Sequence, residues 1–328
     1  MGARGARGPN DQREGWGCMT SHSLSESEIA DAITSLYVPE MGTDVMAPLL
    51  YQFLRFTRAR TVLEAGMGYT TPFLARALRD NAAAFRAEKA AMIAKCDAYV
   101  RELDAMDEAA RIPAGEERMG LAAVYAPKTS PLADRRTRWM FEGGTALLHP
   151  GYYLDERQTG VVCVDNEQSS ASSVRRVEGV LDTIGLRDYV MRHTGNFWSC
   201  DFAALAQDHL PFDLIWIDVP VSFQNAMSLV RGPHWELLNP NGGLLIVHDM
   251  LNHEGGQMLV REVFQAEQRE RFDEFEFVSM LEPQRVIQNS FVMIRNRTGV
   301  QEVQIERQFT APHEADFEAA ARELVRRK

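Results

Sequence analysis

One stretch, Thr61–Leu74, constrains the fold of this 328-residue chain more than any other. It opens with a short apolar run that ends in an acid, Glu64, as a buried parallel strand does. Gly66 and Gly68 follow, then Thr70 or Thr71 as the N-cap of a helix, with Pro72 in its first turn. The stretch predicts a strand, a tight turn and a helix, and the glycines allow a ligand to approach the backbone closely.

The residue types in this turn narrow the ligand that it could hold. A dinucleotide-binding turn needs a third glycine three residues after the second, and Thr71 stands there. A phosphate-binding P-loop needs a Gly-Lys-Ser/Thr run, which the sequence lacks. A nucleoside ligand remains, with Glu64 placed to meet a polar or cationic group. The alternative is a structural turn before a packed helix.

Composition excludes several classes of protein. A hydrophobic content of 45% supports a full core, and a net charge of −11 argues against non-specific nucleic-acid binding. No apolar run approaches the ~20 residues of a membrane span, and no signal peptide is recognisable. The four cysteines lack metal-site spacing, and Cys163 lies in an apolar run typical of a core. We expect a reduced, cytoplasmic protein without nucleic-acid or membrane partners.

The chain divides into four parts. Residues 1–18 are rich in glycine and arginine, so we expect a disordered extension. Residues 19–58 predict two helices, the second over Thr43–Thr57, that cover one side of a ligand cleft. Residues 59–298 carry the α/β pattern, and residues 299–328 form a C-terminal extension with a charged strand-like stretch and a helix.

An insertion, residues 82–158, separates the first strand–helix unit from the second strand. Apolar residues recur every three or four positions from Asn81 to Ile112 and predict a long amphipathic helix. A loop rich in proline and glycine follows. Such an insertion suits a lid or a substrate-binding element, and it equally suits an arm that forms a homodimer.

Polar residues end the predicted strands. The strands after the insertion are expected at Val161–Val164, Tyr189–Thr194, Phe212–Ile217, Leu244–Val247, Phe275–Met280 and Ser290–Arg295. The polar residues at or just beyond strand ends are Glu64, Asp165, Asn196, Asp218, His248 and Asp249. Because parallel strands bring their carboxyl ends to one edge of a sheet, these side chains are expected to form one site.

The run Glu64-Ala-Gly66-Met-Gly68-Tyr-Thr70 resembles motif I of the class I S-adenosylmethionine-dependent methyltransferases. Thr70 stands where that family most often has a third glycine. The acids Asp165 and Asp218 and the turn Pro240–Gly243 match further motifs, so the resemblance covers residues 59–297. It implies a Rossmann-like, doubly wound, mostly parallel seven-stranded sheet with an antiparallel final strand, and S-adenosylmethionine as the cofactor.

The resemblance also implies roles for individual residues. A carboxylate at the end of the second strand, Asp165, would accept hydrogen bonds from the ribose hydroxyls. Asn196 occupies the place where the family often has an acid that contacts adenine. The expected cofactor-binding residues are Glu64, Gly66, Gly68, Tyr69, Thr70, Asp165, Asn166, Asn196 and Asp218.

Catalysis needs an oriented acceptor and a group that takes its proton, because the sulfonium is already an activated leaving group. Asp218 and His248 are the candidate bases, although a strand-end histidine bonded to backbone is an equal alternative for His248. Aromatic faces can stabilise the sulfonium, and the candidates are Tyr69, Tyr152 and Tyr153. We expect no metal, because Met250 replaces the asparagine and residues 219–222 lack the lysine of metal-dependent catechol-type enzymes.

Three functions stay open at this point. The first is methyl transfer from S-adenosylmethionine to a small molecule. The second is cyclisation of S-adenosylmethionine to azetidine-2-carboxylate with release of methylthioadenosine, which a weaker likeness around Tyr69 and Gln288–Ser290 suggests. The third is a non-catalytic binding or scaffold protein that uses the long helix as its interface.

Overall fold

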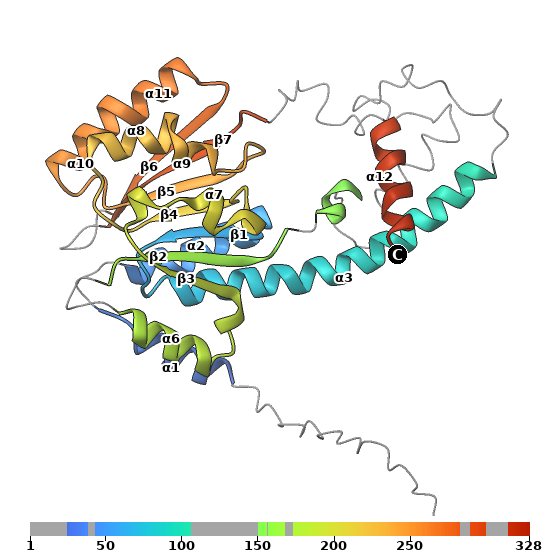
Figure 1. The fold of residues 1–328 in the computed structure, drawn as a ribbon, viewed down its shortest axis with the longest axis horizontal. Coiled ribbons are helices and arrows are strands. Elements are labelled where there is room, and N and C mark those ends of the chain that lie inside the picture. The colour runs from blue at the N-terminus through green and yellow to red at the C-terminus, as the bar shows by residue number, and fades with distance from the viewer. Residues whose placement is uncertain are drawn as a thin grey trace, which may run out of the picture.

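A computed structural model describes residues 25–38, 43–105, 150–155, 157–167, 173–282, 289–299 and 314–328. These residues form one twisted sheet with helices on both faces, and one long helix extends well beyond the sheet (Figure 1). The predicted extension 1–18, the loop after the long helix and the strand-like stretch around Val303 and Ile305 lie outside the described residues.

The sheet has seven strands in the order β3-β2-β1-β4-β5-β7-β6. The strands are β1 (Thr61–Ala65), β2 (Gly160–Asp165), β3 (Val190–Thr194), β4 (Leu214–Ile217), β5 (Leu244–His248), β6 (Phe275–Leu281) and β7 (Ser290–Asn296). The first five strands are parallel, and β7 runs antiparallel between β5 and β6. The predicted doubly wound, mostly parallel sheet with an antiparallel last strand is confirmed.

The central strands read as continuous apolar runs because helices cover both faces of the sheet. All five residues of β1 are buried, and so are all four of β4. Alternate residues therefore enter different cores: Val62 packs into one hydrophobic cluster and Leu63 into the other. The predicted strand ends differ from the observed ends by no more than two residues.

Four helices cover one face. They are α1 (Glu26–Thr34), α2 (Thr43–Thr57), the start of α3 (Thr71–Asp104) and α6 (Val174–Thr183). Ser25 caps α1 in a reciprocal pair of hydrogen bonds with Glu28. The predicted bounds of α2 are those observed. Ile33 and Leu50 from the two N-terminal helices share one core with Val62 of β1.

Shorter helices cover the other face. They are α7 (Phe202–Leu205), α8 (Phe223–Arg231), α9 (Pro233–Glu236) and a continuous run of α10 (Glu254–Leu259), the π-helical η7 (Val260–Phe264) and α11 (Gln265–Glu270). Short 3₁₀ turns lie at Arg187–Tyr189 (η4), Phe197–Ser199 (η5) and Gln207–His209 (η6). Helices α7 and α8 were not predicted from the sequence.

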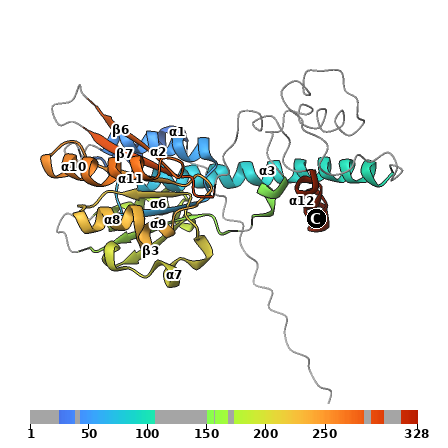
Figure 2. The same ribbon diagram turned by 90° about the horizontal axis from the view of Figure 1, so that it is seen from above.

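Helix α3 is a single helix of 34 residues, not a short helix followed by a separate long one. After Pro72 in its first turn, no proline or glycine interrupts it, so nothing breaks the hydrogen-bond ladder. Its outer half packs against α12 (Glu314–Arg326) and the 3₁₀ turn η3 (Pro150–Leu154), as both views show (Figures 1 and 2). The buried residues of this third cluster are Met92, Cys96, Tyr99, Leu103, Tyr153, Ala321 and Leu324.

None of the helices in the described part of the chain is long and apolar enough to cross a membrane.

Candidate ligand site at the carboxyl edge of the sheet

The strand order creates a switch point at β1, because β2 pairs with one side of β1 and β4 with the other. The crevice outside the carboxyl ends of strands at such a point is where ligands bind in open α/β sheets. Asp165 ends β2, Asp218 follows β4, and His248 ends β5. The structure therefore brings these three predicted residues to one edge.

The backbone of the turn after β1 allows a ligand to approach it closely. Gly66 has φ +90°, a conformation that residues with a Cβ rarely adopt, and its N–H donates to the Val164 carbonyl at 2.9 Å. A Cβ on Gly66 would stand 3.4 Å from the carbonyl oxygen of Asp218. At Gly68, by contrast, no described atom other than those of its chain neighbours lies within 4 Å of a Cβ position, so the turn is open to the described part of the structure.

Glu64 is held by its own loop. Its side chain is fully buried and accepts hydrogen bonds from the hydroxyls of Thr70 at 2.6 Å and Thr71 at 2.7 Å. The Cys163 thiol, opposite Glu64 in the β1–β2 register, donates to it at 2.8 Å. Burial raises the pKa of Glu64 to about 7, and the three donors oppose that rise. In this arrangement Glu64 fixes the glycine turn, and no part of it is exposed.

The threonine pair does not cap α3 in the expected way. Thr70 stands at the N-cap position, as predicted, but its side chain makes no cap hydrogen bond because its hydroxyl donates to Glu64. The Thr71 hydroxyl instead accepts from the Gly68 N–H at 3.1 Å while donating to Glu64. The helix start is therefore tied to the buried carboxylate under it.

Asp165 borders the same turn. Its carboxylate accepts the Met67 N–H at 3.0 Å through one oxygen and the Glu167 N–H at 2.7 Å through the other. Each carboxylate oxygen has a second lone pair, so Asp165 can still accept from a ligand while it orients the loop. Its neighbour Asn166 is exposed.

Asn196 lies two residues beyond β3 and is exposed. Its side-chain oxygen accepts the Trp198 N–H at 2.9 Å and so caps the short 3₁₀ turn η5. The nearby acid Asp201 caps α7 by accepting from the Ala204 N–H. Both side chains thus have local structural partners, and a contact of Asn196 with a ligand stays a prediction.

Asp218 and His248 form a hydrogen-bonded pair on neighbouring strands. Nδ1 of His248 lies 2.9 Å from Oδ1 of Asp218, and Nε2 lies 2.9 Å from Oδ1 of Asn289. Burial lowers the pKa of His248, but the hydrogen bond and charge of Asp218 outweigh it, and the net pKa is raised. The His248 side chain is 2% exposed and that of Asp218 is 25% exposed, so Asp218 is the member of the pair that faces outward.

Trp216 and Asp249 lie next to this pair. Trp216 is a fully buried core residue, and its ring centroid lies 5.5 Å from that of His248. Asp249 is exposed, adopts φ +55° and accepts a hydrogen bond from Asn252 at 2.6 Å. Burial and the charge of Asp218 raise the pKa of Asp249. Within the described ranges, no three His, Cys, Asp or Glu side chains gather as a metal site.

Tyr69 lies in the turn and packs between two other rings. Its centroid is 6.0 Å from that of Tyr37, three residues after the end of α1, and 5.4 Å from that of Phe73 on α3. The turn thus carries an aromatic cluster that includes an exposed residue from the segment after α1. This arrangement keeps Tyr69 at the carboxyl edge.

Tyr152 and Tyr153, the other two aromatic candidates for stabilising the sulfonium, lie elsewhere in the structure. The Tyr152 hydroxyl donates to the Arg58 carbonyl at 3.3 Å, just before β1 begins, and Tyr153 is fully buried and donates to Glu88 at 3.0 Å. Both therefore stand toward the amino end of β1, because the apolar face of η3 packs on α3.

Two hollows of the described surface lie away from this edge. One of about 740 Å³ is lined by residues at the amino ends of β2 and β3, including Gly160 and Val190. Another of about 80 Å³ lies between α2, α3 and η3. Residues 168–172 and 283–288, which are next in sequence to the edge, lie outside the described residues. The site is therefore defined here by its polar groups and its open glycine turn.

No family model matches this chain, and no curated protein matches it. Solved structures do match. The O-methyltransferase TomG from Streptomyces achromogenes, involved in tomaymycin synthesis and solved with S-adenosylmethionine, is 16% identical over 84% of this chain and 92% of that chain, with a TM-score of 0.44. An O-methyltransferase from Bacillus cereus in complex with S-adenosylhomocysteine is 14% identical over 84% and 93%, with a TM-score of 0.44.

A methyltransferase from Geobacter sulfurreducens is 13% identical over 84% of this chain and 91% of that chain, with a TM-score of 0.40. All three are described as methyltransferases, and two of them were solved with S-adenosylmethionine or S-adenosylhomocysteine. At such identities and TM-scores they carry no argument about the activity of this chain, which depends on its own residues.

Two groups in the site were not found from the sequence. Asn289 was noted only as part of a weak likeness, although it directly precedes β7 and so reaches the end of β5. Cys163 was read as a core residue and is fully buried, but its bond to Glu64 was not foreseen. Strand register could have indicated both contacts. Cys163 stands opposite Glu64 in the β1–β2 pairing, and Asn289 precedes β7, which pairs with β5.

Proposed function

We propose that this chain binds S-adenosylmethionine at the carboxyl edge of its sheet and transfers the methyl group to a small molecule. The observation that supports this most is the convergence at the switch point. There the open turn at Gly68 stands between Asp165 on one side and the Asp218–His248 pair on the other. The family resemblance of the turn agrees with this ligand.

The binding half of the proposal rests on the turn and Asp165. The backbone of Gly66–Gly68 leaves room for an adenosyl group, and the free lone pairs of Asp165 would accept two ribose hydroxyls. Glu64 acts beneath the ligand rather than on it, by tying Thr70 and Thr71 to the floor of the turn. Asn166 and Asn196, both exposed, are the proposed contacts for the rest of the nucleoside.

When bound, S-adenosylmethionine supplies an electrophilic methyl group on a sulfonium. The chain must then orient the acceptor and take up its proton. Asp218 is partly exposed and is the proposed base, and His248 shares the proton through Nδ1. Asn289 presents its oxygen to the Nε2–H group, so the hydrogen bond to the Asp218 carboxylate forms when Nδ1 also carries a proton. His248 is thus a positioning residue behind the base.

Incubation with S-adenosylmethionine and a panel of small phenols, carboxylates and amines, followed by mass spectrometry, tests the activity. The expected product is S-adenosylhomocysteine, formed only when an acceptor is present, together with an acceptor heavier by one methylene unit. Asp218→Asn should reduce turnover more than it weakens cofactor binding, because the amide cannot accept the proton.

Glu262→Gln, which changes an exposed acid of η7, is the matched control and should leave turnover unchanged. Methylthioadenosine formed from S-adenosylmethionine alone would contradict methyl transfer and indicate cyclisation. Binding without turnover of any acceptor in the panel would contradict the transferase proposal while keeping the binding site.

A further inference from the structure

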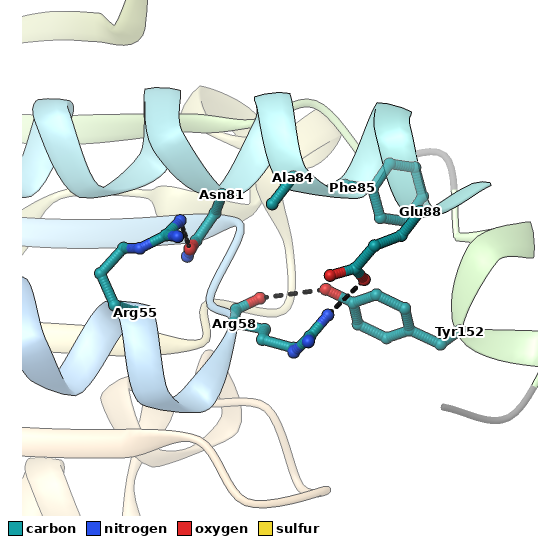
Figure 3. A pocket seen from close by; sticks show the side chains of 7 residues that line it. All are labelled: Arg55, Arg58, Asn81, Ala84, Phe85, Glu88 and Tyr152. Carbon is teal, nitrogen blue, oxygen red and sulfur yellow. Dashed lines mark hydrogen bonds and ion pairs between the residues drawn. The ribbon is translucent and has the colours of Figure 1, made fainter. Parts of the chain in front are cut away.

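A small polar hollow lies far from the carboxyl edge, where α2, α3 and η3 meet. Its volume is about 80 Å³, and Figure 3 shows two arginines from the end of α2 pointing toward side chains of α3. Its lining includes Arg55, Arg58, Asn81, Phe85 and Tyr152. At roughly 10–15 Å³ for each water-sized probe position, such a volume holds several waters or one compact polyatomic ion.

The first arginine has an uncharged partner. Nη1 of Arg55 donates to Oδ1 of Asn81 at 2.6 Å, and Arg55 makes no ion pair with any described residue. The amide nitrogen of Asn81 is occupied by the carbonyls of Leu54 at 2.9 Å and Ala59 at 2.7 Å, so its oxygen must face the guanidinium. One hydrogen bond to a neutral oxygen leaves the charge of Arg55 uncompensated and most of its donors available.

The second arginine is held in place at an energetic cost. Arg58 has φ +55°, in the left-handed region that favours glycine. It occupies the residue after the end of α2, where the Ala59 N–H donates to the Leu54 carbonyl at 3.1 Å, as in a helix-terminating Schellman turn. An arginine at a position that suits glycine points to a use for its side chain, which reaches into the hollow beside Glu88.

The surroundings leave a positive charge. Two arginines and one carboxylate, that of Glu88, line the hollow. Glu88 pairs with Arg58 and accepts from the Tyr153 hydroxyl, so among the described residues Arg55 is left without a carboxylate partner. Arg60 lies over the Phe85 ring at 4.6 Å, but its ion pair with Asp155 at 3.3 Å compensates its charge. The hollow therefore carries an excess of one positive charge, on a chain whose net charge is −11.

We propose that this hollow binds a small oxyanion of the phosphate class through the guanidinium groups of Arg55 and Arg58. Guanidinium groups present planar forks of donors that match tetrahedral oxyanions, and both arginines line this hollow. The half-buried Phe85 and Tyr152 wall limits the ligand to a compact group. Because α3 carries Asn81 and begins at the glycine turn, the site lies on the helix that leaves the proposed active site.

Isothermal titration of the full chain with inorganic phosphate, against chloride at equal ionic strength, tests the proposal. The wild type should bind one phosphate, and Arg55→Gln and Arg58→Gly should each weaken binding roughly ten- to a hundredfold. Arg58→Gly is the informative variant, since it removes the guanidinium while relaxing the backbone, and it should not unfold the chain. Arg101→Gln, which changes an arginine 77% exposed on the same helix, should bind like the wild type.

A glycerol phosphate titration distinguishes the source of the group. Binding by both compounds, lost in the two variants, supports a site that takes the phosphoryl group of a larger molecule. Binding by inorganic phosphate alone supports a site for the free ion. No saturable heat with either compound, or equal affinity in the wild type and Arg58→Gly, would overturn the proposal.

Discussion

The buried carboxyl of Glu64 should make the stability of this protein fall as the pH rises. Its pKa is about 7 in the folded chain, against an ordinary value of 4.5. The folded state therefore holds a proton that the unfolded state releases between these values. Stability from this group is complete below about pH 4.5 and is lost as the pH rises through about 7.

The magnitude follows from the difference between the two pKa values. One pKa unit corresponds to about 1.4 kcal/mol, so this single group should lower the free energy of unfolding by ~3 kcal/mol between pH 4.5 and pH 8. Burial is the main cause, and the hydroxyls of Thr70 and Thr71 reduce the effect by stabilising the charged form. Without those donors the loss would be larger.

Comparison of the wild type with Glu64→Gln isolates this term from all other titrations. The amide cannot ionise, so the variant should lack the decline, and its stability relative to the wild type should improve as the pH rises from 5 to 8. Urea unfolding followed by tryptophan fluorescence measures the free energy, with Glu262→Gln as an exposed control that should keep the wild-type profile. Parallel profiles for the wild type and Glu64→Gln would refute the assigned role.

Other contacts give equally direct outcomes. Asp165→Ala should weaken S-adenosylmethionine binding by ~1–3 kcal/mol in calorimetry, and unchanged affinity would remove Asp165 from the site. His248→Gln should remove stability that is present at low pH and lost as the pH rises above 6.5 through the raised pKa of His248, which urea unfolding at pH 5 and pH 9 measures. Tyr152→Phe should leave turnover unchanged, because Tyr152 lies toward the amino end of β1, and a large loss in an activity assay would contradict that placement.

The sheet could be predicted well because its signals are local and repeated. Each central strand is a short apolar run that ends at a polar residue, and the strand order follows the βα alternation. The neighbouring positions of Asp218 and His248 followed from the same pattern, and their 2.9 Å contact is observed. The buried face of α3 was also predicted, since Met92, Cys96, Tyr99 and Leu103 recur at helical spacing.

The features that could not be predicted depend on the direction of side chains and on contacts between residues distant in sequence. The pattern around Glu64 cannot distinguish a carboxylate that meets a ligand from one that accepts the hydroxyls of its own loop, and the structure shows the second. Tyr152 follows the insertion, so its place depended on how η3 docks on α3. The short helix α7, of four residues, carries too few turns for a periodic signal.

The central claim is that the carboxyl edge of this sheet holds an adenosyl ligand, and a crystal grown with S-adenosylmethionine tests it most directly. The expected electron density lies over the Gly66–Gly68 turn, with the ribose hydroxyls on Asp165 and the sulfonium methyl facing the side of Asp218. Density at another part of the molecule, or an edge that excludes the compound at saturating concentration, would contradict the account.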